Sequence, residues 1–193
     1  PADFDALESF CAIMADDGER EVELMDLGQR GAYQAVVLPV ATLAASTHPE
    51  IPSAESMLMA GADFVVMPGN GLCGGPDCGI LIGPEAEIKR IQSSQAWASL
   101  MAGDAQQAML LITLELAAAN PESIPVRAML ETGEENLRAR AERLATRLSA
   151  SDHVKTCQIT DDEARITAKG RWRVPSRQVR LRHHSLTAEA WKQ

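Results

Sequence analysis

One stretch of the chain, residues 61–83, decides the fold; it reads GADFVVMPGNGLCGGPDCGILIG. Phe64–Met67 is a short apolar run, Ile80–Ile82 is another, and glycine and proline fill the segment between them. Apolar runs of this length, bounded by glycine and proline, are typical of strands joined by a turn. The stretch therefore predicts a strand, a glycine-rich turn and a second strand.

The segments on either side continue an α/β pattern. Ala35–Val40 is a continuous apolar run, as expected of a strand buried on both faces, and Pro39 should mark its end. Ser53 is placed to cap a short helix that runs to Ala60. Pro84 suits the first position of a helix that runs to about Ser94.

Helical spacing predicts two helices at the start of the chain. The first should run from Asp3 to about Asp17, with one apolar stripe, and the second from about Glu21 to Gln29. The members of the stripe are Phe4, Leu7, Phe10, Cys11 and Met14.

Two longer helices and a small sheet are expected after the hairpin. Asp104–Ala119 has apolar residues at helical spacing, and Glu131–Ser149 is a charged amphipathic helix. In the second helix, Leu137, Ala141, Leu144 and Leu148 should face inward and the arginines outward. The segments 153–159, 164–167 and 178–182 alternate polar and apolar residues, which predicts a half-exposed antiparallel sheet, and Thr187–Lys192 should begin a terminal helix.

Composition indicates a globular protein without an obvious membrane or disulfide signature. The 193 residues have a net charge of −9, no run of eighteen apolar residues and no positively charged leader pattern. The four cysteines have no framework spacing, so free thiols in a cytoplasmic protein are expected, and no metal site is assigned.

Charge is distributed unevenly along the chain. Residues 138–193 contain 13 of the 18 basic residues but six of the 27 acidic ones, which gives +7 there and −16 in residues 1–137. This asymmetry is consistent with an anionic partner for the basic part, or with docking of the basic part on an acidic surface of the same protein or of a twin subunit.

The order of these motifs resembles a known family. The hairpin resembles the cofactor-lysine segment of selenocysteine synthase, L-seryl-tRNA(Sec) selenium transferase, an aminotransferase-like enzyme family that uses pyridoxal phosphate. A weaker likeness follows at Ser123–Leu130 and Glu134–Leu144, and Val174-Pro175-Ser176 is similar to the small domain. The resemblance implies an α/β fold: the C-terminal part of an aminotransferase-like large domain over residues 1–103, then a bridging helix and a small α+β domain over residues 104–193.

The residues that carry the family's chemistry are not matched. Aligned without a gap, Gly71 occupies the position of the Schiff-base lysine, and Leu43 that of the aspartate that pairs with the pyridine nitrogen. The turn that holds the cofactor phosphate in the family has no counterpart in this sequence. Pyridoxal phosphate is the family's cofactor, but none is expected here, and no catalytic residue is assigned.

The glycine-rich turn is then a vestigial cofactor site, comprising Gly69, Asn70, Gly71, Gly74 and Gly75. Its backbone amides are a candidate anion cradle, but retention for the shape of the hairpin and the subunit contact is favoured. Asp63 and Asp77 are interpreted as turn or capping residues.

A second candidate surface is basic. Because the resemblance implies a family that handles a charged tRNA, residues Arg171, Trp172, Arg173, Arg177, Arg180 and Arg182 are candidate RNA or anion contacts. The net charge of −9 argues against tight nonspecific binding of nucleic acid. The arginines of the amphipathic helix are interpreted as a solvated face.

The leading hypothesis is a noncatalytic or strongly altered homologue that acts as a binding or structural subunit, as a homodimer or with a partner subunit that covers an incomplete core. One alternative is a fragment of an active pyridoxal phosphate-dependent transferase or lyase in which a shifted lysine, Lys89, serves. Another is an RNA-associated protein that uses the strand region from Arg171 to Arg182.

Overall fold

The computed structural model describes residues 11–15, 33–167 and 172–191, with the backbone alone described for residues 11–15. The chain divides into two compact units. Among described residues, unit 1 runs to Glu131, and unit 2 comprises residues 132–167 and 172–191. The division had been expected between residues 103 and 104, so the helix over Asp104–Ala119 falls in unit 1 rather than at the start of the second domain.

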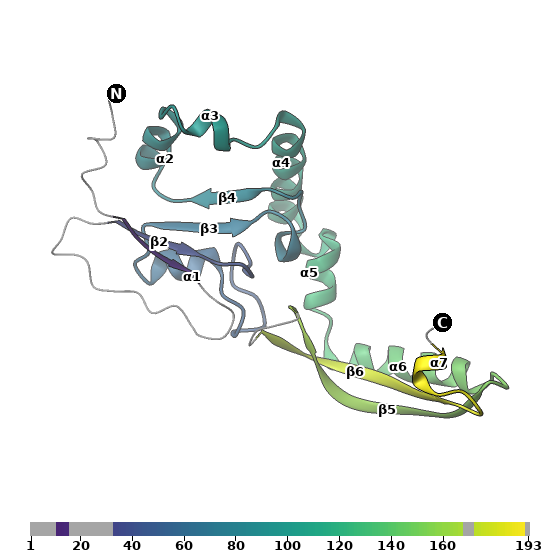
Figure 1. Ribbon diagram of the computed structural model, residues 1–193. Coiled ribbons are helices and arrows are strands. Elements are labelled where there is room, and N and C mark those ends of the chain that lie inside the picture. The colour runs from purple at the N-terminus through teal and green to yellow at the C-terminus, as the bar shows by residue number, and fades with distance from the viewer. Residues whose placement is uncertain (1–10, 16–32, 168–171, 192–193) are drawn as a thin grey trace. The chain divides into compact units, whose positions relative to one another are not determined.

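Unit 1 is built on a four-stranded sheet in the order β1-β2-β3-β4 (Figure 1). Its strands are β1 (Cys11–Ala15), β2 (Tyr33–Val37), β3 (Phe64–Pro68) and β4 (Gly79–Ile82). The first three run parallel, and β4 returns antiparallel to β3, with Met67 opposite Ile80. The predicted strand, turn and returning strand are therefore confirmed.

Strand β2 is buried because it lies between two neighbours and carries an apolar run. Val36 is fully buried, and the Leu38 amide donates to the Val66 carbonyl just beyond the strand. The strand ends at Val37, two residues before Pro39, which cannot donate a ladder hydrogen bond.

The helices of unit 1 are α1 (Ala54–Met59), α2 (Glu85–Gln92), α3 (Trp97–Leu100), α4 (Asp104–Ala119) and α5 (Pro125–Leu130). Ser53 caps α1 as predicted: its side chain accepts from the Ser56 amide, and the Ser56 hydroxyl accepts from the Ser53 amide. The partly buried Leu58 of α1, and Leu110 and Leu114 of α4, pack against a core that includes Val36 of β2 and Val65 and Met67 of β3.

The helix expected over Asp3–Asp17 is wrong where it can be checked, because Cys11–Ala15 forms β1. Five residues of β1 pair with five of β2, and this tertiary pairing outweighs a weak helical stripe. The remaining residues of that helix, and the helix expected over Glu21–Gln29, lie outside the described residues.

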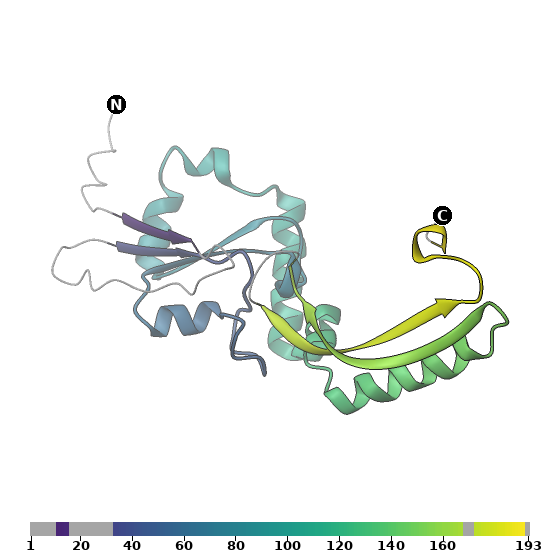
Figure 2. The ribbon, with the colours of Figure 1, turned by 60° about the horizontal axis from the view of Figure 1, so that its bottom comes forward.

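Unit 2 is a helix on a two-stranded sheet. Helix α6 (Glu134–Ser149) runs along the antiparallel strands β5 (Val154–Arg165) and β6 (Arg173–His183), and α7 (Ala188–Trp191) follows (Figure 2). The two segments expected at 153–159 and 164–167 join into one long strand. Ala141 is buried as expected, but Leu144 is exposed, because the inner face of α6 is narrower than its apolar stripe.

Candidate functional site: the glycine-rich turn and a basic groove

The glycine-rich turn between β3 and β4 closes on itself through backbone hydrogen bonds. The Gly69 amide donates to the Cys78 carbonyl at 2.7 Å, and the Gly75 amide donates to the Gly69 carbonyl at 2.9 Å. The Gly74 amide donates to the Gly71 carbonyl at 3.1 Å, around the short 3-10 turn η2 (Gly71–Cys73). These three amides hold the turn together, so an anion cradle would have to be made from the others.

Two positions in this turn require glycine for its backbone conformation. Gly71 has φ +64° and Gly74 has φ +75°, both in the left-handed region. A Cβ added at Gly71 would meet nothing within 4 Å, whereas one at Gly74 would lie 2.5 Å from Cγ2 of the buried Ile124. Gly74 is thus fixed by packing as well as by conformation, and Gly71 by conformation alone.

The two aspartates serve the turn and the sheet. The Asn70 side-chain amide donates to the Asp77 carboxylate at 3.0 Å across the turn. The Asp63 carboxylate accepts from the Gln34 amide at 2.7 Å, which ties the start of β3 to β2. The Asp77 contact agrees with its interpretation as a turn residue, whereas the Asp63 contact joins two neighbouring strands and is neither a turn nor a cap.

The residues of this hairpin do not fit a Schiff-base cofactor. No side chain of the turn has an amine, and Gly71 stands where the resemblance requires one. Leu43, at the position of the pyridine-nitrogen aspartate, packs against the hydrophobic core. Lys89 lies on α2, where its ammonium group pairs with Glu85 at 2.5 Å on the exposed surface.

The thiols near the turn are free in the structure. Cys73 is buried and Cys78 is partly buried, and neither forms a disulfide; Cys157, on β5 of unit 2, is partly buried and also free. Burial raises the pKa of the Cys73 thiol above its ordinary value, and the neighbouring Cys78 adds to the effect, while a hydrogen bond from the Gly75 backbone opposes it. Cys73 is therefore a protonated, poorly nucleophilic core residue at neutral pH.

The basic residues singled out on the last strand do not share one face. Arg173 pairs with Glu163 at 3.1 Å, and Arg180 lies 3.8 Å from Asp162. Arg177 is mostly buried between Glu134 and Asp161. Arg182 is exposed, and Trp172 has only 2% of its surface exposed, so its ring does not offer a stacking platform; Arg171 lies outside the described residues.

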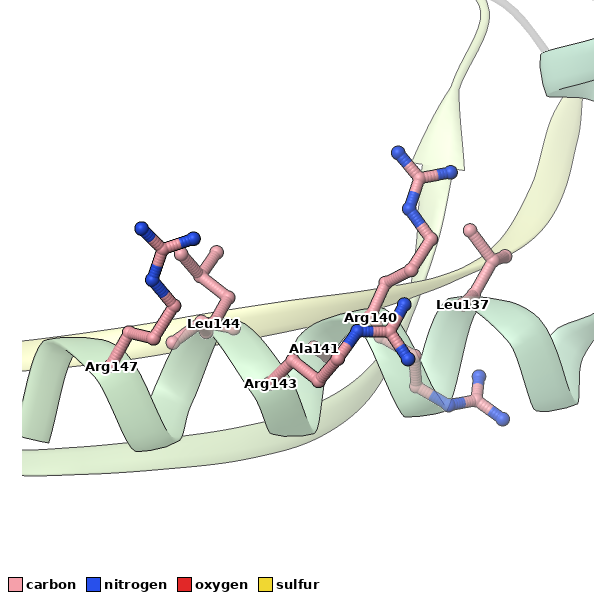
Figure 3. A pocket seen from close by; sticks show the side chains of 8 residues that line it. Leu137, Arg140, Ala141, Arg143, Leu144 and Arg147 are labelled. Atoms are coloured by element: carbon pink, nitrogen blue, oxygen red, sulfur yellow. The ribbon is translucent and has the colours of Figure 1, made fainter.

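Unit 2 instead has a basic groove on α6 that the sequence interpretation did not identify. Arg140, Arg143 and Arg147 of α6 line it (Figure 3), and Arg177 of β6 also belongs to its lining. The spacing of the three helical arginines was visible in the sequence, but it does not distinguish a groove from a solvated face. Only the packing of β6 beside the helix creates the concave surface.

Other classes of site find no support in the described part of the chain. Among the described residues, no three histidine, cysteine, aspartate or glutamate side chains are grouped as a metal site would need. Nor does any helix within those residues have the length and apolar character needed to cross a membrane.

These features define a class: an α/β protein whose sheet ends in a hairpin with a glycine-rich turn, followed by a small α+β unit. The model of the L-seryl-tRNA selenium transferase family matches residues 20–193, so the chain belongs to that family. The resemblance seen in the hairpin is confirmed, and a pyridoxal phosphate-dependent transferase fold is what family membership implies.

Curated relatives cover part of the chain. The L-seryl-tRNA(Sec) selenium transferases of Salmonella paratyphi B and Salmonella heidelberg are each 34% identical to it over 105 residues. The match takes in 53% of this chain and 23% of each relative, so the chain corresponds to less than a quarter of the relatives' length.

Proposed function

We propose that this chain is a noncatalytic member of the L-seryl-tRNA selenium transferase family that acts as a binding or structural subunit. The observation that carries the proposal is Gly71, a residue without an amine at the tip of an otherwise well-formed hairpin. Its left-handed backbone, with φ +64°, suits glycine and disfavours lysine. Covalent attachment of pyridoxal phosphate needs a free amine at this point. We therefore expect no covalent bond between the cofactor and this turn.

The rest of the hairpin supports a structural role for the turn. Three of its amides are used in its own hydrogen bonds, and the buried Cys73 belongs to the hydrophobic core. Leu43 is likewise a core contact rather than a polar partner for a pyridinium nitrogen. The same sequence thus preserves the shape of the hairpin and lacks the groups for the family's chemistry.

The proposal includes a partner, either a second copy of this chain or another subunit. Helix α4 has no buried residue, and its exposed apolar side chains include Met109, Ile112 and Leu116. These residues follow helical spacing at i, i+3 and i+7, so they form one stripe. An exposed apolar stripe of this kind is typical of a contact surface.

The test is titration of the purified protein with pyridoxal phosphate, followed by borohydride reduction and peptide mapping. We expect no stoichiometric adduct at any single lysine, only scattered labelling of exposed amines. Lys89→Arg is the matched variant, because it keeps the charge and the pairing with Glu85 but removes the only lysine among the described residues of unit 1. A stoichiometric adduct at Lys89 that this variant abolishes would show an active enzyme with a relocated lysine and overturn the proposal.

A further inference from the structure

The basic groove of unit 2 is a concave surface with a volume of about 660 Å³. Helix α6 forms one wall, and Arg177 and Val179 of β6 form the other. Its size lies within the range of small-ligand sites in proteins. All of the residues that line the groove belong to unit 2.

Three of its four guanidinium groups have no acidic partner in the part of the chain that the structure describes. Among the described residues, no carboxylate lies within ion-pair distance of Arg140, Arg143 or Arg147. Arg177 differs, since Glu134 and Asp161 hold it at 2.9 and 3.0 Å. The groove therefore has one arginine in its wall that is ion-paired within unit 2, and three without a carboxylate partner in the described part of the chain, which can bind an external anion.

The arrangement along the helix matches an extended anion rather than a single ion. In Figure 3 the side chains of Arg140, Leu144 and Arg147 rise from the same side of α6. At a rise of 1.5 Å per residue, the seven steps from Arg140 to Arg147 span about 10 Å along the helix axis, with Arg143 between them. Several negative groups in succession would satisfy this row, whereas one small anion would reach only part of it.

The side chains that line the groove also indicate which chemical group of the ligand they recognise. Guanidinium groups bind phosphate oxygens through paired N–H donors. Among the described residues, no aromatic side chain lines the groove, and its remaining walls are aliphatic, including Leu137 and Leu144. A nucleobase would find no ring to stack on, so recognition would be of phosphate groups.

We propose that the α6–β6 groove binds a ligand with consecutive phosphate groups, either a free oligophosphate or the backbone of a nucleic-acid strand. Arg140, Arg143 and Arg147 provide the contacts, and Arg177 shapes the wall. This site is independent of whether the chain retains cofactor chemistry at the hairpin.

The experiment uses two probes with the full chain. Binding of tripolyphosphate is measured by calorimetry, and binding of a fluorescent eight-nucleotide oligouridylate by anisotropy, each over a range of salt concentrations. With three phosphate contacts on a single strand, the plot of log K against log salt has a slope of about −2, so a fourfold rise in salt weakens binding of the oligomer about twentyfold. Binding of tripolyphosphate alone identifies a free oligophosphate as the source, and binding of the oligomer with weak competition by tripolyphosphate identifies a strand.

Two matched variants on the same helix test the site. Arg147→Gln should weaken binding several-fold and reduce the magnitude of the salt slope by about 1. Arg138→Gln removes the same charge from α6, but Arg138 lies outside the groove and pairs with Glu142 at 3.1 Å, so this substitution should leave affinity unchanged.

Two triple variants test the row of arginines as a whole. Replacing Arg140, Arg143 and Arg147 together by glutamine should abolish binding, while replacing all three by lysine should retain much of it. Circular dichroism confirms that each variant is folded.

Several results would overturn the proposal. The first is that neither probe binds at low salt. The second is an equal loss of affinity in the Arg138→Gln and Arg147→Gln variants, which would indicate that long-range charge alone attracts the probe. A third is a change in oligomeric mass in the triple glutamine variant without any binding of phosphate by the wild type. That result would assign the groove to a contact between copies of the chain.

Discussion

Gly71 has open space where a side chain would lie, but its backbone conformation disfavours any residue that has a side chain. A Cβ there would meet no heavy atom within 4 Å, so no steric contact keeps the position as glycine. Its φ of +64° lies in the left-handed region, where a non-glycine residue costs about 1–2 kcal/mol. The backbone of this turn, and not crowding, thus opposes a lysine at the position that matters most for the family's chemistry.

This reasoning predicts the effect of placing a lysine in the turn. Gly71→Lys should lower the free energy of unfolding by about 1–2 kcal/mol, because the left-handed conformation becomes strained. Gly79→Lys is the matched control, since Gly79 also has open space around its missing Cβ but does not have a positive φ. It should change stability by less than about 0.5 kcal/mol, as is usual for exposed positions. Urea unfolding measures both, and equal losses would contradict the assignment of strain to Gly71.

At the scale of single residues, local chemistry was predictable from sequence and burial was not. Ser53 as a cap and Asp77 as a turn residue follow from hydrogen bonds that short polar side chains make near their own position. Asp63 instead bonds the Gln34 amide, 29 residues away, which no local pattern predicts. Trp172, expected to be available for stacking, is buried, because its exposure depends on what packs against it. The row from Arg140 to Arg147 became a groove only through the position of β6.

At the scale of elements, η2 is attached to the segment that leads into α5. Gly74 ends η2 with φ +75°, and its missing Cβ leaves room for the Ile124 side chain, which is 4% exposed. Gly61 also has a positive φ, +109°, but no heavy atom lies within 4 Å of its Cβ position. Comparing substitutions at Gly74 and Gly61 therefore separates the free-energy cost of backbone strain from the cost of overpacking.

Gly74→Ala should therefore destabilise the protein more than Gly61→Ala. Strain contributes about 1–2 kcal/mol in the left-handed region, and forcing a methyl group against the buried Ile124 adds about 1–3 kcal/mol. Gly61→Ala should show the strain alone. Thermal and urea unfolding of the two variants test this, and similar losses would mean that Ile124 moves aside without cost.

Elements with strong periodicity or clear boundaries were predictable. The best example is α4, whose bounds follow from its apolar spacing and from Asn120-Pro121 at its end. Strand β1 was missed because Cys11 and Met14 fall on a helical apolar stripe, whereas the conformation of Cys11–Ala15 is set by pairing with β2. The fusion of two expected strands into β5 was missed for a related reason: the continuous ladder with β6, with Asp162 opposite Ser176, extends the strand through a polar segment.

For the whole molecule, the sequence indicated two parts with opposite charge, but not where they separate. The expected boundary at residue 104 followed a helix start, whereas the compact units divide after Glu131. Within unit 1, Glu131 accepts a hydrogen bond from the Thr47 hydroxyl, and the His48 ring contacts the Leu130 carbonyl at 2.9 Å. These contacts join segments more than eighty residues apart, and no local pattern in the sequence reveals them.

The exposed stripe on α4 gives a prediction about assembly. Met109, Ile112 and Leu116 are 50%, 57% and 47% exposed, so covering each would contribute about 1 kcal/mol. If a second copy covers the stripe, sedimentation should give twice the mass of the 20.8 kDa chain. Ile112→Lys should then raise the dimer dissociation constant more than tenfold, because both copies lose a buried apolar contact.

Met59→Lys is the matched control for that experiment. Met59 is more exposed than Ile112, at 83%, and it lies on α1 rather than on the α4 stripe, so this substitution should leave the mass unchanged. A wild-type chain that stays monomeric at all concentrations would exclude a second copy as the occupant and leave a different subunit to cover α4. If both variants weaken the dimer equally, the contact is general hydrophobic association, since a defined interface on α4 would respond to Ile112 alone.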